Sequence, residues 1–305
     1  MLKKIGRLQI FALLLIAIIL QISCSSPELT DNNISELDPP TGQTEAGGSV
    51  IEGSAQENDG LTPVEETEEK LAAPPVLPRV GLYNGRGSWE TNVSAFYNFF
   101  EQYGYRCSYF NEVDAVEMDM GDQFDLICFP GGFAAEYKNF ISEHDNIRSY
   151  VEEGGLFVGV CAGAYYACDT LRWQGTDHPY PLGLYDGKGV GPLSGLVAWG
   201  EKADITLTGE HPVNAGFNES MEMYYFDGPY FEPYERGTVE ILARYDVNDE
   251  PAVIAGSHGN GSYLLLGTHP ELGGYSHSSP EFNLEGGDGA QWPWLHSALL
   301  WLAER

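Results

Sequence analysis

One cysteine of this sequence stands where a reactive thiol would be expected. The run from Leu156 to Val160 is apolar and of the β type, Cys161 ends it, and small residues follow up to Ala164. A sharp strand-to-helix turn of this kind lifts one side chain above the carboxyl end of a sheet, and flanking glycines relieve the crowding. A helix start at Cys161 would favour the thiolate, and the N–H of Ala162 would point to where an oxyanion forms. The alternative is a buried structural cysteine after a core strand.

A base for this thiol is expected at a second strand end. Thiolate catalysis needs a base, and the base works best when a carboxylate orients it. Of the seven histidines, His269 is the one that follows a predicted core strand, with Glu271 two positions further on. Rigid Pro270 between them favours an extended turn that aims the carboxylate at the imidazole. The alternative is a surface turn in which both side chains face water.

A glycine turn offers the other half of an oxyanion hole. Gly131 and Gly132 follow Pro130 at the end of a predicted strand over 124–129. Such a turn exposes backbone N–H groups toward the sulfur, although a plain turn is the common alternative. No spacing of cysteines and histidines resembles a metal site, and we expect neither a metal nor a cofactor.

The predicted elements bring these residues to one edge of a sheet. Apolar strands are expected at 79–83, 106–110, 124–129 and 156–160, with helices at about 91–103 and 147–153. Continuous apolar strands alternating with helices predict an α/β fold, a three-layer and mostly parallel sheet with helices on both faces. Ligands bind beyond the carboxyl ends of such strands, where the loop from Asn84 meets the two turns above.

The second half of the domain is richer in strands. They are expected at 203–208, 222–226, 239–245, 251–257 and 261–267, and an amphipathic helix at 294–303 closes the chain.

The N-terminus reads as an export signal. A basic start precedes an apolar run over 10–20 that is too short for a comfortable membrane span. Residues 20–24 then resemble a bacterial lipobox, with small Ser23 before Cys24 and Gln21 as a departure. Residues 1–23 are therefore expected to be a lipoprotein signal peptide, with Cys24 carrying the lipid. The alternatives, a cleaved signal peptide or a short anchor helix, also export the domain, so we expect an extracytoplasmic location at the cell membrane.

Residues 24–75 read as an acidic, disordered tether and 76–305 as the folded domain. The tether is rich in Glu, Asp, Ser, Thr, Gly and Pro and has no apolar periodicity, so it cannot bury enough surface to fold. The whole chain carries a formal net charge of −30. This charge argues against nucleic acid as a partner and against electrostatic attraction to anionic lipid.

The cysteines do not predict a disulfide framework. There are five, an odd number, and Cys107 and Cys128 lie in predicted strands as buried thiols. Cys161 and Cys168 are expected about two turns apart on one helix, roughly 10 Å, which is too far to bridge.

Three of these motifs together resemble a known family. Residues 130–132, 159–163 and 269–271 look like the class I glutamine amidotransferase fold with its Cys-His-Glu triad. The separation between Cys161 and His269 suits that fold, whose topology is flavodoxin-like.

The closer resemblance is to the domain found at the N-terminus of eukaryotic-type biotin–protein ligases, which also occurs alone in microbes. Residues 161–167 look like the elbow of that subgroup, and residues 225–231 resemble its Tyr-Asn-Gly-Gly segment, with Asp227 and Pro229 as departures. The resemblance covers nearly all of 76–305.

The resemblance implies a role for each matching residue. Cys161 would be the nucleophile, His269 the general base and acid, and Glu271 the group that orients the histidine. The implied oxyanion donors are Gly131, Gly132 and Ala162. The residues expected in the substrate pocket are Asn84, Tyr165, Tyr225 and Asp227.

Glutamine is not implied as the substrate. Amidotransferases usually have Gln soon after the elbow glycine, whereas Ala164 and Tyr165 stand there in this chain. No synthetase or biotin-ligase catalytic domain is recognisable, so neither ammonia transfer nor biotin ligation is expected. We expect an exported, lipid-anchored cysteine hydrolase that acts on a small-molecule or peptide-like amide.

Two alternatives stay open. One is a binding module of the same fold that has lost turnover and binds a small ligand between aromatic rings. Those rings would be Trp89, Tyr165, Tyr166, Tyr225 and Tyr230. The other is a glutaminase-like subunit recruited by a separate chain, which export disfavours.

Overall fold

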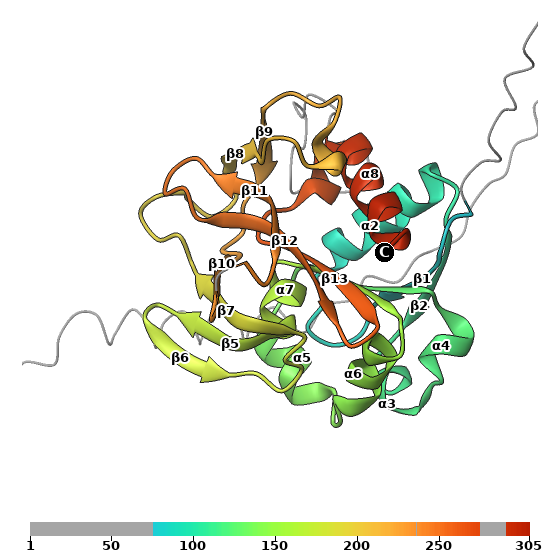
Figure 1. Cartoon of the computed structure of the whole chain (residues 1–305). Helices are drawn as coiled ribbons and strands as arrows, with labels where there is room; N and C mark the ends of the chain where they lie inside the picture. Colours follow the sequence, from blue (N-terminus) through green and yellow to red (C-terminus); the bar gives the residue numbers. More distant parts are fainter. Residues whose placement is uncertain (1–75, 236, 275–290) are drawn as a thin grey trace, which may run out of the picture. The chain divides into compact units, whose positions relative to one another are not determined.

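The computed structural model of the chain describes residues 76–235, 237–274 and 291–305 (Figure 1). The predicted signal peptide, the lipidation site Cys24 and the tether over 24–75 lie outside the described residues. In the described part of the chain no helix is both long enough and apolar enough to cross a membrane.

A nine-stranded sheet runs through the domain in the order β2-β1-β3-β4-β13-β12-β11-β8-β9. Its first five strands, from β2 to β13, pair in parallel, and the rest pair antiparallel. The parallel strands are β1 (Arg79–Tyr83), β2 (Arg106–Phe110), β3 (Leu126–Phe129), β4 (Leu156–Val160) and β13 (Gly261–Leu266). The antiparallel strands are β8 (Lys202–Leu207), β9 (Ser220–Tyr224), β11 (Glu240–Tyr245) and β12 (Pro251–His258). The parallel half has the strand order of the flavodoxin-like fold.

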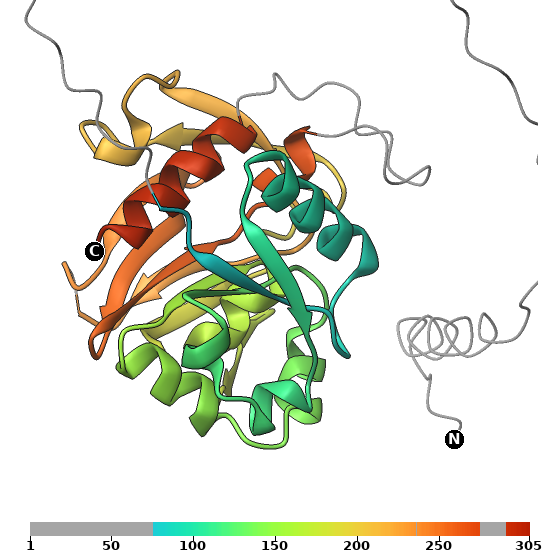
Figure 2. The same ribbon diagram turned by 90° about the vertical axis from the view of Figure 1, so that its right-hand side faces the viewer.

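Two long helices cover one face of this sheet. They are α2 (Glu90–Gln102) and α8 (Gln291–Ala303), which lie side by side in Figures 1 and 2. The apolar residues of α2 recur at helical spacing, and Val93, Phe96, Phe99 and Phe100 are all buried. The rings of Phe99 and Trp292 join the two helices, with centroids 5.5 Å apart.

Shorter helices cover the other face under the parallel strands (Figure 2). They are α3 (Asp114–Glu117), α4 (Met120–Gln123), α5 (Ala134–Phe140), α6 (Asp145–Glu152) and α7 (Ala162–Ala167). Each face of the sheet thus has its own large apolar core, one formed with α2 and α8 and the other with the shorter helices.

A second, four-stranded sheet lies below β12 in Figure 1, in the order β10-β7-β5-β6. Its strands are β5 (Cys168–Trp173), β6 (Thr176–Pro179), β7 (Tyr185–Gly191) and β10 (Tyr230–Pro233). This sheet is absent from the sequence prediction. All four residues of β6 are exposed and β7 contains three glycines, so neither strand carries an apolar alternation that would reveal it.

The predicted α/β fold, with a large sheet between helices, is confirmed. Each predicted strand and long helix is present to within a few residues, whereas the short helices α3, α4 and α5 were not predicted. The sheet is only half parallel, because the C-terminal strands pair as hairpins. Cys168 begins β5 and does not lie on the helix after Cys161, and the four cysteines of the domain are free thiols.

Candidate active site

The turn at Cys161 is a strained junction between β4 and α7. Cys161 has φ 51° and ψ −101°, a backbone conformation that non-glycine residues rarely adopt and that often marks functional sites. Its side chain is 5 % exposed. A Cβ on Gly159 would lie 2.6 Å from the carbonyl oxygen of Gly163, and a Cβ on Gly163 would lie 2.0 Å from that of Phe129. The two glycines therefore let α7 press against β3 and β4, which fixes where the sulfur sits.

His269 and Glu271 form a fully buried pair behind this thiol. Their side chains have no exposed surface, and Nδ1 of His269 lies 2.7 Å from Oε1 of Glu271. The backbone N–H of His269 donates to the carbonyl of Tyr224 at 2.9 Å, which ties the turn to β9. The ring of Phe226 stands edge-on to the imidazole at 5.2 Å. The predicted surface-turn alternative is therefore wrong for these two residues.

Asn92 completes this buried polar group, and the sequence prediction missed it. It lies on α2, it is fully buried, and its Nδ2 donates to Oε1 of Glu271 at 2.7 Å. The same nitrogen lies 3.1 Å from Nδ1 of His269. A signal did exist in the sequence, because Asn92 is a lone amide on the helix face that carries Phe96 and Phe99.

The charge of His269 depends on its neighbours. Burial alone would lower the pKa of the imidazole, but the charges of Glu271 and Cys161, together with side-chain contacts to both, raise that pKa to about 10. Nε2 is buried without a well-aligned hydrogen-bond partner among the described residues. The thiol itself donates to the carbonyl of Phe226 at 3.4 Å. An imidazolium held beside a thiol favours the thiolate form.

Two of the three predicted oxyanion donors reach the space in front of the sulfur. Gly132 and Ala162 line the same cleft as Cys161. Neither backbone N–H donates a hydrogen bond to another backbone group among the described residues. Gly131 packs against the imidazole instead, since a Cβ there would lie 2.5 Å from Cε1 of His269. Gly131 is therefore a spacer beside His269 and does not line the cleft.

A cleft of about 590 Å³ opens in front of Cys161. Of the four residues predicted for the substrate pocket, Tyr165 and Asp227 line it. Asn84 does not, because it is exposed at the end of β1, where its N–H donates to the carbonyl of Phe110. Tyr225 does not either, because it is fully buried behind the wall and its hydroxyl bonds to Leu193 and Gly228.

The walls of the cleft are aromatic, but with different rings from those predicted. Of the predicted set, only Tyr165 lines the cleft. The other rings come from the start of α5, from β5, from the chain after β6 and from two loops of the second half. They are Phe133, Trp173, Tyr180, Trp199 and Phe226. The sequence did not reveal Trp173 and Tyr180, because they belong to the second sheet and the chain next to it, which was not predicted.

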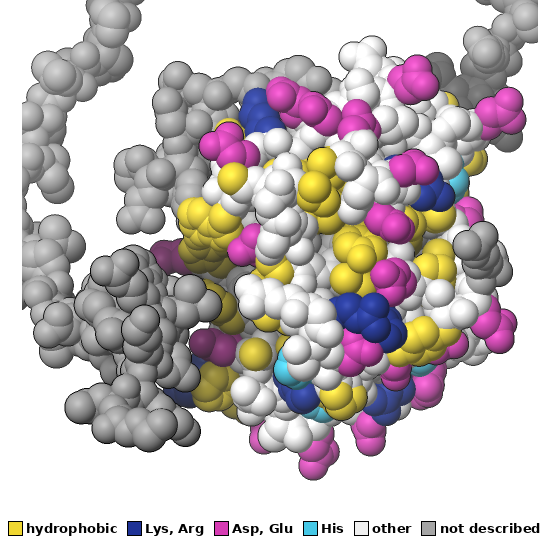
Figure 3. Space-filling view, turned by 90° about the vertical axis from the view of Figure 1, so that its left-hand side faces the viewer, with side chains coloured by type: hydrophobic (Ala, Val, Ile, Leu, Met, Phe, Trp, Pro, Cys, Tyr) yellow, Lys and Arg dark blue, Asp and Glu magenta, His cyan; other side chains and the backbone are white. Residues whose placement is uncertain are grey.

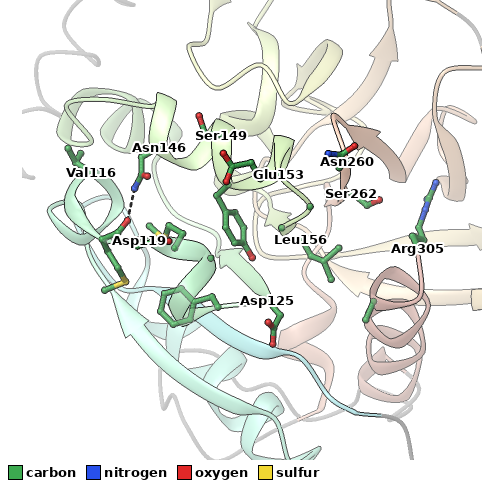
Figure 4. Close-up of a pocket in the computed structure, with 18 of the residues that line it drawn as sticks. Val116, Asp119, Asp125, Asn146, Ser149, Glu153, Leu156, Asn260, Ser262 and Arg305 are labelled. Atoms are coloured by element: carbon green, nitrogen blue, oxygen red, sulfur yellow. Dashed lines mark hydrogen bonds between the residues drawn. The ribbon is translucent and has the colours of Figure 1, made fainter.

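A larger hollow of about 820 Å³ lies at the opposite edge of the sheet, where β3, β4 and β13 begin (Figure 4). Asp119 and Arg305 lie toward its two ends. Two charged residues of its lining form ion pairs with side chains outside the lining. Asp125 pairs with Arg79 at 2.8 Å, and Arg305 pairs with Glu240 at 2.7 Å. No cysteine or histidine is among the described residues that line the hollow, and the described residues contain no cluster of three or more His, Cys, Asp or Glu that could hold a metal.

Comparison with known proteins agrees with this geometry. Residues 79–285 match the family described as "Biotin-protein ligase, N terminal". The chain is 27% identical over 167 residues to a biotin–protein ligase of Schizosaccharomyces pombe, which covers 48% of this chain and 25% of that protein. It is 29% identical over 168 residues to an uncharacterised protein of Chlamydia muridarum, with 48% of this chain and 60% of that protein covered.

The fold is shared with a solved glutamine amidotransferase. The TM-score is 0.52 at 20% sequence identity, and the match covers 74% of this chain and 99% of that one. The chain spans only 25% and 60% of the lengths of these two sequence relatives. Because the family match extends over most of the described domain, the chain belongs to the biotin–protein ligase N-terminal family, and it has the glutamine amidotransferase-like fold.

Proposed function

We propose that this protein is a cysteine hydrolase of amide bonds, with Cys161 as nucleophile, His269 as general base and acid, and Glu271 as the group that orients the histidine. The observation that carries the proposal is the buried pair of His269 and Glu271 behind a strained, cleft-lining thiol. A buried carboxylate–imidazole pair is costly to desolvate, and a ligand-binding wall has no need of one.

The chemistry would follow in two steps. The thiolate of Cys161 adds to the amide carbonyl carbon, and the C–N bond breaks as the imidazolium of His269 gives its proton to the leaving amine. Water, deprotonated by His269, then adds to the thioester, and the C–S bond breaks to release the acid and restore the thiolate. The N–H groups of Gly132 and Ala162 would stabilise the oxyanion in both steps.

The reactivity of the thiol toward iodoacetamide tests this proposal. We expect selective alkylation of Cys161 at pH 6.5, because burial raises the pKa of Cys107 to about 12 and that of Cys128 as well. His269→Ala should slow the reaction at least about tenfold. Since the pKa of His269 is raised to about 10, the imidazolium is present below that pH. The advantage of the wild type should therefore persist through neutral pH and vanish as the pH rises through 10.

Peptide mapping by mass spectrometry gives the rate at each cysteine, with Cys107 and Cys128 as internal controls. A Cys161 that reacts no faster than these two, and does not respond to His269→Ala, contradicts the proposal. Turnover is then tested with aminomethylcoumarin amides, where intact-mass spectrometry detects the acyl group on Cys161. A reactive thiol that forms no acyl-enzyme and binds ligands without cleaving them would instead identify a silent binding module.

We further propose that the domain is exported and anchored to the membrane by lipid on Cys24. The support is the basic start, the apolar run over 10–20 and the lipobox-like residues 20–24. Metabolic labelling with an alkyne fatty acid should mark the wild type and leave Cys24→Ser unlabelled. Equal labelling of both proteins would contradict lipidation at this residue.

A further inference from the structure

Aromatic side chains line the cleft in front of Cys161, where they would contact a bound ligand. Phe133 and Trp199 are 66 % and 56 % exposed, and together with Trp173 they line the cleft. Aromatic faces carry negative quadrupole potential and attract organic cations that lie against them. The cleft therefore suits a ligand with an apolar body and favours a positive group over a negative one.

One carboxylate belongs to this cleft, and it is held in place by the backbone. Asp227 has φ 60°, in the left-handed region. Its carbonyl oxygen accepts a hydrogen bond from the hydroxyl of Tyr165 at 3.0 Å. The next residue, Gly228, packs so closely that a Cβ there would lie 1.9 Å from the carbonyl oxygen of Gly267. The residue before it supplies the carbonyl that accepts from Cys161, so Asp227 is positioned by the same wall that contacts the thiol.

No cationic side chain of the described residues pairs with this carboxylate. The structure gives the side chain of Asp227 no hydrogen bond and no ion pair with any described residue, and burial raises its pKa. Two basic residues line the cleft. Lys138 is engaged elsewhere, since its Nζ donates to the carbonyl of Pro179 at 2.8 Å and lies 5.0 Å from the ring centre of Tyr180. His178 is exposed on β6.

We propose that Asp227 binds an ammonium group of the substrate, so that the amides cleaved at Cys161 are those of cationic, apolar compounds. The inference rests on the proposed function and adds the class of substrate. A partly buried carboxylate without a cation, next to aromatic faces, gains from an ammonium both an ion pair and a cation–π contact. The net charge of −30 of the whole chain also raises the local concentration of cations.

Three chloroacetamides that share one benzyl scaffold test the assignment. N-benzylchloroacetamide is neutral, its 4-aminomethyl derivative is cationic and its 4-carboxy derivative is anionic. In each reaction the thiolate of Cys161 forms a bond to the CH₂ carbon, the C–Cl bond breaks and chloride leaves, while the proton stays on the imidazolium of His269. For each protein variant, the rate constant of each probe is divided by that of unsubstituted chloroacetamide. This ratio removes differences between variants in the intrinsic reactivity of the Cys161 thiol.

Asp227→Asn is the informative variant, because asparagine also tolerates the left-handed backbone and the fold should be kept. Asp204→Asn is the matched control: it removes the same charge from an exposed position on β8, outside the cleft lining. We expect wild type and Asp204→Asn to prefer the cationic over the anionic probe by about tenfold or more, and Asp227→Asn to bring that ratio near one.

The outcomes separate the two proposals. Rapid reaction with unsubstituted chloroacetamide but equal rates for the three benzyl probes overturns the substrate class and leaves the nucleophile standing. A cationic preference that Asp227→Asn and Asp204→Asn reduce equally also overturns it, since only the overall charge would then matter. A Cys161 that reacts with none of the probes overturns the proposed function and this inference with it.

Discussion

The carboxylate of Glu271 accepts hydrogen bonds at a single oxygen from two donors, His269 at 2.7 Å and Asn92 at 2.7 Å. Its second oxygen is buried without a partner among the described residues. In such a place each remaining hydrogen bond fixes the orientation of the group, because water cannot substitute for a lost donor. Asn92 is therefore a positioning residue, which acts on the imidazole through Glu271 and at a distance from the thiol.

The role of Asn92 as the donor to Glu271 predicts the effect of Asn92→Ala. Loss of the donor should slow alkylation of Cys161 at pH 6.5 by about tenfold to a hundredfold, since the imidazole is no longer held in place. It should also lower the free energy of unfolding by about 1–3 kcal/mol. Alkylation rates across pH 6 to 10 and denaturant unfolding measure the two effects.

Asn214→Ala provides the matched control. Asn214 is another buried asparagine, bonded to the carbonyls of Thr208 and Leu242 and to Trp294. Its removal should destabilise the domain to a similar degree without changing the alkylation profile of Cys161. If both variants react like the wild type, Asn92 has only a structural role.

At the scale of elements, the position of the sulfur depends on how closely α7 approaches β3. Gly163→Ala would place a Cβ 2.0 Å from the carbonyl oxygen of Phe129, so the helix must move outward. We expect a loss of about 1–3 kcal/mol in the free energy of unfolding and slower alkylation of Cys161, because Cys161 and Ala162 move with the helix. Urea unfolding and the iodoacetamide rate are the measurements.

Gly121→Ala is the comparison for this prediction. Gly121 lies on α4, and a Cβ there meets only an oxygen of Asp119 at 3.7 Å. Alanine is the better helix former, so this change should be neutral or slightly stabilising. A Gly163→Ala protein as stable and as reactive as Gly121→Ala would show that close packing of α7 does not position the thiol.

At the scale of the whole molecule, the charge is the dominant feature. Figure 3 shows acidic side chains spread over one face, among hydrophobic ones and fewer Lys and Arg. With a net charge of −30, self-repulsion opposes the compact state, and salt screens it. Raising NaCl from 20 mM to 0.5 M at pH 7.5 should therefore raise the melting temperature, by about 2–4 °C for each kcal/mol of repulsion removed. Differential scanning calorimetry measures the shift.

The same titration near pH 4.3, the isoelectric point of the sequence, is the control. The net charge is close to zero there, so the melting temperature should respond little to NaCl. Equal responses at the two pH values would mean that salt acts by another route than screening of the net charge.

Local patterns in the sequence determined the fold class, the elbow and the His269–Glu271 turn. Each of these features depends on residues that are neighbours in the sequence, such as the apolar run 156–160 with its glycines or the three residues 269–271. Such short-range patterns reflect strand periodicity and turn sterics, which need no knowledge of distant contacts. The export signal and the tether stay predictions of the same kind.

The surroundings of the thiol, by contrast, depend on contacts between segments that are far apart in the sequence. Asn92 lies 177 residues before His269 and reaches it because α2 packs against the turn after β13. Part of the aromatic lining comes from β5 and β6, whose sequences carry no clear period. The prediction that Asn84 and Tyr225 line the pocket is wrong, because the sequence does not show whether a side chain faces the cleft, the core or the solvent. Burial and the pairing of distant segments come from the packing of the whole chain, and no local pattern encodes them.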